Sequence, residues 1–142
     1  MERARPASPR IGSGPFLVAL GGAVGTLTRH GVSLGLGHLD GWSVGWATVL
    51  VNVTGAFALG WLAAVLARRR ASRAGLLLST GVLGGYTTYS GFALDVVDSA
   101  REGVPVTALA LVAVTLAAGF AACWAGVRLG SRTRATEASP VR

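Results

Sequence analysis

Cysteine is almost absent from this chain of 142 residues, in which Cys123 is the single thiol. Without a second cysteine, neither an internal disulfide nor a cysteine-based metal site can form within the chain. Lysine is absent as well, because all thirteen basic residues are arginines.

Charged side chains are also few. They make up 13% of the chain and hydrophobic residues 51%, whereas a soluble domain is about 25% charged. The composition therefore favours a membrane protein. Four stretches contain no charged residue, and a helix that crosses the hydrocarbon core needs roughly 20 residues, with about 17 to 25 tolerated. These stretches are residues 11–28, 41–67, 74–94 and 103–127.

The four stretches indicate an all-α membrane protein with a transmembrane domain over residues 14–130. We expect an N-terminal tail over residues 1–13 and a polar, disordered C-terminal tail over residues 131–142. The beginning of the chain partly fits a signal peptide, but its glycines, Arg29 and the three further spans favour a mature first helix. Little of the chain remains for an additional soluble domain.

Acidic side chains are missing from the first, second and fourth spans. A proton-coupled drug exporter generally needs a titratable acid at membrane depth, so this absence argues against that class. No nucleophile, base and orienting group occur together in a pattern that suggests an enzyme. Asp95 and Asp98, at the end of the third span, are expected at the membrane interface.

Arginines are distributed unevenly around the spans. Eleven lie in segments that a four-span topology places on one face of the membrane, against Arg101 alone on the other. Short arginine-rich segments stay cytoplasmic, so we expect both tails in the cytoplasm of a multi-pass inner-membrane protein. A basic surface for anionic lipid headgroups is compatible with the same pattern. The eleven are Arg3, Arg5, Arg10, Arg68, Arg69, Arg70, Arg73, Arg128, Arg132, Arg134 and Arg142.

The third span contains an unusual stretch, GGYTTYSGF, from Gly84 to Phe92. Its adjacent glycines and its hydroxyl-bearing residues have modest helix propensity, and the hydroxyls compete for backbone hydrogen bonds. We therefore expect a break in the middle of that span. Broken backbone at membrane depth must be buried in protein or line a wet cavity, so breaks tend to mark ion or substrate sites. A simple kink is the alternative. Many glycines are expected only to pack helices, as in the pair Gly55 and Gly60.

Polar residues inside the spans are candidates for function. Asn52 lies near the middle of the second span with Thr48 one turn before it, and its amide suits either a neighbouring helix or a passing ion. Arg29 is costly in hydrocarbon, about 2.5 to 3.5 kcal/mol at a helix centre. It suits either a structural anchor or an anion-attracting role. Thr107 and Thr115 place hydroxyls near one face of the fourth span.

Three motifs together resemble the Fluc/CrcB fluoride channels. They are GGAVGTLTRH over residues 21–30, ATVLVNVTGAFALG over residues 47–60 and GVLGGYTTYSGF over residues 81–92. The resemblance spans residues 21–126 in order. It implies a dimer of antiparallel subunits with two fluoride pores and a central, structural sodium ion.

The resemblance also implies roles for individual residues. Backbone carbonyls of Gly84 and Thr87 are the implied sodium ligands, and Arg29 is the implied structural or anion-attracting arginine. The implied pore residues are Asn52, Thr48, Tyr89, Ser90, Phe92 and Thr115.

The chain departs from the family pattern at three positions. Tyr89 stands where the family usually has phenylalanine, His30 where an aromatic residue is common, and Leu111 where many members have tyrosine. An antiparallel homodimer also needs a sequence that inserts both ways, whereas eleven arginines against one fix a single orientation. We therefore expect a heterodimer with a homologous subunit of opposite charge bias, which exports fluoride passively. A non-conducting scaffold subunit is the alternative.

Overall fold

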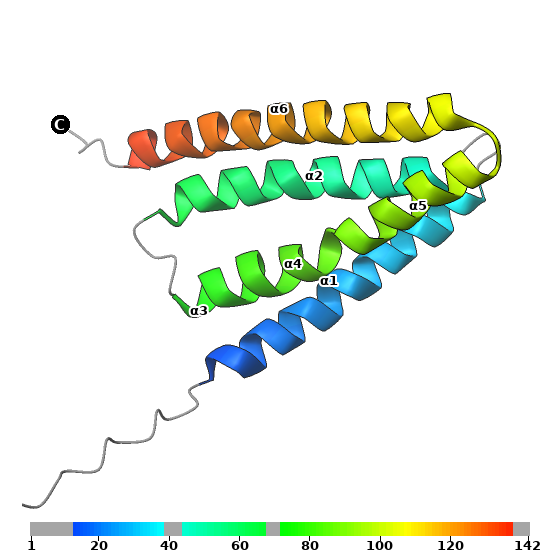
Figure 1. Ribbon diagram of the computed structural model, residues 1–142. Coiled ribbons are helices and arrows are strands. Elements are labelled where there is room, and N and C mark those ends of the chain that lie inside the picture. Colours follow the sequence, from blue (N-terminus) through cyan, green and yellow to red (C-terminus); the bar gives the residue numbers. More distant parts are fainter. Residues whose placement is uncertain (1–12, 39–43, 68–71, 138–142) are drawn as a thin grey trace, which may run out of the picture.

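The computed structural model describes residues 13–38, 44–67 and 72–137, and these ranges contain helices and turns but no strand. They form four helical rods that alternate in direction (Figure 1). This number agrees with the four spans expected from the sequence. Three rods are α1 Gly14–Gly37, α2 Val44–Val65 and α6 Pro105–Glu137, and the third rod in chain order combines α3 Arg73–Gly75, the π-helix η1 Leu76–Leu83, α4 Gly84–Tyr86 and α5 Tyr89–Arg101.

The rods pack as two pairs joined by α5. α2 lies along α6, and α1 lies along η1 and α4. The two pairs diverge toward the end at which α1 begins, whereas α5 contacts α6 toward the other end (Figure 1). The third rod therefore has different neighbours before and after its middle.

Glycines allow the paired helices to approach closely. A Cβ atom added at Gly25 would collide with the carbonyl oxygen of Val82 and lie 2.8 Å from the amide nitrogen of Tyr86. In the other pair, a Cβ atom at Gly60 would collide with the carbonyl oxygen of Cys123. At these positions the backbones touch directly, which confirms that small residues pack the helices.

The turn between α5 and α6 depends on one glycine. Gly103 has a φ of +78°, a left-handed conformation that glycine adopts without steric cost. The amide of Val104 donates to the Ser99 carbonyl at 3.1 Å, and Pro105 then begins α6. Proline suits the first position of a helix, where its missing N–H has no helical partner. The chain can therefore reverse direction within a few residues.

Much of the exterior is apolar. Phe16 is 71% exposed and Val106 77% exposed, and large exposed apolar surfaces mark contact with lipid or protein. By length and hydropathy, Gly45–Val65 in α2 and Pro105–Thr133 in α6 could each cross a membrane. The first rod contains Arg29 and His30, which lower its mean hydropathy. The third rod is divided into shorter helices, so no single helix in it is long enough.

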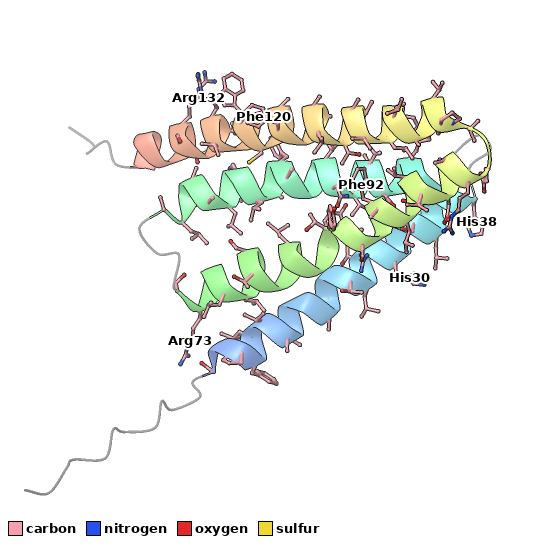
Figure 2. The ribbon with its side chains drawn as sticks, viewed as in Figure 1. His30, His38, Arg73, Phe92, Phe120 and Arg132 are labelled. Carbon is pink, nitrogen blue, oxygen red and sulfur yellow. The ribbon has the colours of Figure 1, made fainter. Side chains whose placement is uncertain are left out.

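The described arginines of the arginine-rich segments gather at one end of the bundle. Arg73 and Arg132 lie at that end and His38 lies at the other (Figure 2). Arg101 is in the last turn of α5, at the His38 end. The remaining tail and loop arginines, Arg3, Arg5, Arg10, Arg68, Arg69, Arg70 and Arg142, lie outside the described residues, as does the side chain of Arg134.

The last helix is longer than the sequence predicted. α6 continues to Glu137, so the first part of the expected disordered tail is helical. The lack of a side chain at Gly130 lets the end of α6 pack closely against α2, since a Cβ atom there would lie 2.6 Å from the carbonyl oxygen of Trp61. Arginine and alanine, which are good helix formers, continue the helix. Residues 138–142 lie outside the described range.

Candidate functional site

Two extended residues interrupt the third rod. Thr87 has φ −74° and ψ 154°, and Thr88 has φ −146° and ψ 124°. α4 therefore ends at Tyr86 and α5 begins at Tyr89. The hydroxyl of Thr88 caps α5 by accepting a hydrogen bond from the amide of Gly91 at 3.1 Å, a role that threonine commonly fills at helix starts.

Asn52 of α2 pairs with this extended backbone. Its Nδ2 donates to the Thr88 carbonyl oxygen at 2.9 Å, and its Oδ1 accepts from the Thr88 amide at 2.8 Å. The side chain thus replaces both partners that a continuous helix would have supplied. α2 lies close enough for Asn52 to contact Thr88 because Gly55 has no side chain, and a Cβ atom there would collide with the side chain of Thr87. Of the two alternatives for Asn52, the structure shows the bridge to a neighbouring rod.

The interruption changes the hydrogen bonding of two carbonyls. In a continuous helix, the amides of Thr88 and Gly91 would donate to the carbonyls of Gly84 and Thr87. Here those amides donate to Asn52 and to the Thr88 hydroxyl instead. A Cβ atom at Gly84 would also meet nothing within 4 Å, so the position borders open space. Carbonyl oxygens without helical donors suit a metal cation, and the predicted sodium ligands therefore fit that ion chemically.

A groove of about 400 Å³ lies between the interruption and α6, and we call it the phenylalanine groove. The rings of Tyr89 and Phe92 lie in it with centroids 6.4 Å apart and planes inclined by 51°. Thr115 faces them from α6, and its hydroxyl oxygen is buried without a hydrogen-bond partner. The lining residues are Asn52, Ala56, Thr87, Thr88, Tyr89, Phe92, Thr115, Leu116, Gly119 and Phe120.

A second cavity of about 370 Å³, the Arg29 cavity, lies on the other side of Thr88. Arg29 and Asp95 both line it, and Nε of the arginine and Oδ2 of the aspartate are buried without a partner. Thr48, which is 9% exposed, lines it as well. Asp95 is half-buried and its carboxylate faces this cavity, while its expected position at the membrane interface stays a prediction. The other lining residues are Thr26, Leu27, His30, Ser33, Val51, Thr88 and Gly91.

The residues predicted for the pore divide between these two cavities. Thr88 lines both, so the interruption of the third rod separates them. Ser90 is exposed and lines neither, and its hydroxyl lies 3.4 Å from that of Thr88. The phenylalanine groove contains Asn52, Tyr89, Phe92 and Thr115, whereas the Arg29 cavity contains Thr48 and Arg29.

Sequence reasoning missed several lining residues, among them Thr88, Phe120 and Asp95. Phe120 is 78% exposed at the rim of the phenylalanine groove, about one helical turn after Leu116, which also lines it. Asp95 follows Thr88 by seven residues, which is about two helical turns and therefore the same face. Leu111, one of the departures from the family pattern, is 1% exposed and lies in the core.

The phenylalanine groove has a distinctive set of chemical groups. Its described lining offers amide and hydroxyl hydrogens and aromatic ring edges, without a carboxylate, imidazole or thiol. Asn52 has a second Nδ2 hydrogen beyond the one it donates to Thr88. Ring edges are electropositive because the aromatic quadrupole is negative only on the ring faces. These groups suit contact with a small anion rather than covalent chemistry.

Apolar helices around an interrupted rod and a groove of hydrogen-bond donors describe a small, all-helical membrane protein of the ion-transport type. Residues 16–127 match the family described as CrcB-like protein, Camphor Resistance (CrcB). The chain belongs to this family, which confirms the resemblance seen in its motifs.

Several relatives bear the name fluoride-specific ion channel FluC. The protein from Hyphomonas neptunium is 42% identical over 125 residues, which cover 84% of this chain and 97% of the relative. That from Paracoccus denitrificans is 43% identical over 114 residues, covering 80% and 90% of the two chains. That from Chelativorans is 41% identical over 116 residues, covering 80% and 93%.

The Asn52 bridge predicts a local effect of substitution. Asn52→Leu should make the amides of residues 84–92 exchange with solvent at least about tenfold faster, because an unsatisfied part-buried polar group costs about 1–3 kcal/mol. Hydrogen exchange followed by mass spectrometry measures this. The control is Thr28→Val, since the Thr28 hydroxyl donates only to the Val24 carbonyl within α1. Unchanged exchange in Asn52→Leu would contradict the bridging role.

Proposed function

We propose that this chain is a subunit of a fluoride-selective channel that exports fluoride passively from the cytoplasm. The observation that carries the proposal is the phenylalanine groove, where Asn52, Thr115 and two aromatic rings meet. The names of the FluC relatives support fluoride as the ion. Fluoride enters cells as the weak acid HF and is trapped as the anion, so a passive pathway is enough to lower its cytoplasmic level.

The groove offers what fluoride requires. The ion is small and strongly hydrated, and it enters a narrow pathway only where donors replace its water. The second Nδ2 hydrogen of Asn52 and the Thr115 hydroxyl are donors of this kind. The electropositive edges of Tyr89 and Phe92 add weaker attraction. The described lining of the groove holds no carboxylate or imidazole, which suits passive transport.

We also propose that the carbonyls of Gly84 and Thr87 hold a structural sodium ion. Both carbonyls have lost their helical donors to the interruption, as described above. A bound cation supplies positive charge near the middle of the membrane, where it lowers the electrostatic cost of an anion. The chain's own contribution is to keep the extended Thr87 and Thr88 in place through Asn52.

The groove is incomplete in a single chain, which supports a dimer. Tyr89 is 81% exposed and Phe120 is 78% exposed, although both border the groove. A second, antiparallel subunit would cover these rings. Since eleven arginines oppose one, the chain should insert in a single orientation with both termini in the cytoplasm of the inner membrane. The partner is then a homologous subunit with the opposite charge bias.

The departures from the family pattern favour a second candidate, a scaffold subunit that completes only its partner's pores. Tyr89 adds a hydroxyl where a plain ring is usual, and Leu111 puts an apolar side chain in the core where many members have tyrosine. In either case the dimer itself would conduct fluoride. The two candidates differ in whether this chain's own groove carries the ion.

Heterodimer formation predicts that the chain alone is inactive. Purified chain reconstituted in liposomes should release trapped fluoride no faster than protein-free liposomes, because a chain inserted in one orientation cannot form an antiparallel pair. A fluoride electrode measures the release. Adding the homologous subunit of opposite charge bias should restore it. Robust efflux from the chain alone would exclude an obligatory heterodimer while leaving the fluoride pathway intact.

Substitution of Phe92 tests conduction through this chain's groove. In the reconstituted dimer, Phe92→Leu should reduce fluoride efflux at least about tenfold, which corresponds to about 1.4 kcal/mol of lost stabilisation of the ion. The leucine keeps the apolar bulk but lacks the electropositive ring edge. Phe16→Leu is the matched control, because Phe16 is 71% exposed on α1 and lies outside the groove. Equal efflux in both variants would instead favour the scaffold.

A further inference from the structure

One exposed face of α6 changes from aromatic to basic toward the end of the helix. Phe120, Trp124, Arg128 and Arg132 follow one another at intervals of four residues, and we call them the aromatic–arginine stripe. All four are exposed. Gly126 and Gly130 are buried against α2, and each lies two residues from Arg128. At about 100° per residue, Arg128 therefore points away from α2.

The position of the stripe matches a membrane boundary. α6 has 33 residues and so extends about 50 Å, whereas the hydrocarbon core is about 30 Å thick. One end of the helix must lie beyond the core. Trp124 is 55% exposed, and tryptophan is enriched where hydrocarbon meets water. Arg128 and Arg132 then fall at headgroup level, and Figure 2 shows Arg132 at the same end of the bundle as Arg73.

Arg128 is held in a defined position beside Trp124. Its guanidinium carbon lies 4.4 Å from the centroid of the indole ring, a cation–π contact that orients the group. The N–H donors of a guanidinium lie in its plane, so they stay available to a planar or tetrahedral anion. Among the described residues Arg128 has no acidic partner, and the described acidic side chains Asp95, Asp98 and Glu102 lie on or after α5.

We propose that the aromatic–arginine stripe binds the headgroup of an anionic phospholipid. Arg128 binds the lipid phosphate, Arg132 adds positive charge one turn farther along, and Trp124 packs against the glycerol and upper acyl region. The opposite charges of lipid and stripe select an anionic lipid over a zwitterionic one. The proposal does not depend on fluoride conduction, because Trp124, Arg128 and Arg132 do not line the phenylalanine groove.

Native mass spectrometry of the purified full chain tests the proposal with phosphatidylglycerol as the probe. Arg128→Gln should weaken phosphatidylglycerol retention about fivefold, the factor expected for one basic side chain at an anionic surface. Arg101→Gln is the matched control, because the substitution removes the same charge and Arg101 is exposed at the opposite end of the bundle. It should change retention less than twofold. Trp124→Leu keeps all the charges but removes the ring on which the Arg128 guanidinium stacks. It should weaken retention about two- to fivefold.

Four results would overturn the proposal. Equal losses in Arg128→Gln and Arg101→Gln would show that net charge alone attracts the lipid. Equal retention of phosphatidylcholine would show that the anionic headgroup is not recognised. Displacement of phosphatidylglycerol by excess inorganic phosphate would assign the stripe to free phosphate. A Trp124→Leu chain that binds like the wild type would likewise contradict it, even if Arg128→Gln failed to fold.

Discussion

The paired hydrogen bonds between the Asn52 amide and the Thr88 backbone hold the extended segment of the third rod in place. An extended pair of residues in an apolar bundle leaves backbone groups without helical partners, and an unpaired group in lipid costs several kcal/mol. Asn52 supplies a donor and an acceptor at 2.9 and 2.8 Å. The third rod can then change direction, so that its first part packs on α1 while α5 turns toward α6.

Glycine contacts make this arrangement possible and keep it rigid. Gly55 brings α2 against Thr87, next to the residue that Asn52 bridges, and Gly25 brings α1 against Val82 and Tyr86. With the rods fixed on both sides, Tyr89 and Phe92 begin α5 at the phenylalanine groove, opposite Thr115. The same interruption places Arg29 and Asp95 in a separate cavity. One short extended segment thus sets the positions of both sets of polar residues.

Much of this arrangement could be predicted from the sequence, but the pairing of residues could not. Charge-free stretches predicted the four rods, and the motif around Gly84 identified the segment where the structure has extended residues. The family was identified from the same motifs. Asp95 was not predicted to line a cavity because it lies at the end of an apolar stretch, where only the helical phase set by Thr88 shows that it faces inward. Packing between the rods decides which atoms Asn52 contacts and separates Thr48 from the phenylalanine groove. No local sequence pattern encodes this packing.

We propose that the Asn52 bridge leaves the Gly84 and Thr87 carbonyls available to a cation. Solid-state NMR of the channel in membranes, with carbonyl carbons labelled at Gly84 and Thr87, measures this. Replacing sodium with a large organic cation should shift both signals and leave the carbonyl of Gly60 in α2 unchanged. Gly84 and Thr87 signals that do not respond to sodium would show that these carbonyls do not hold the ion.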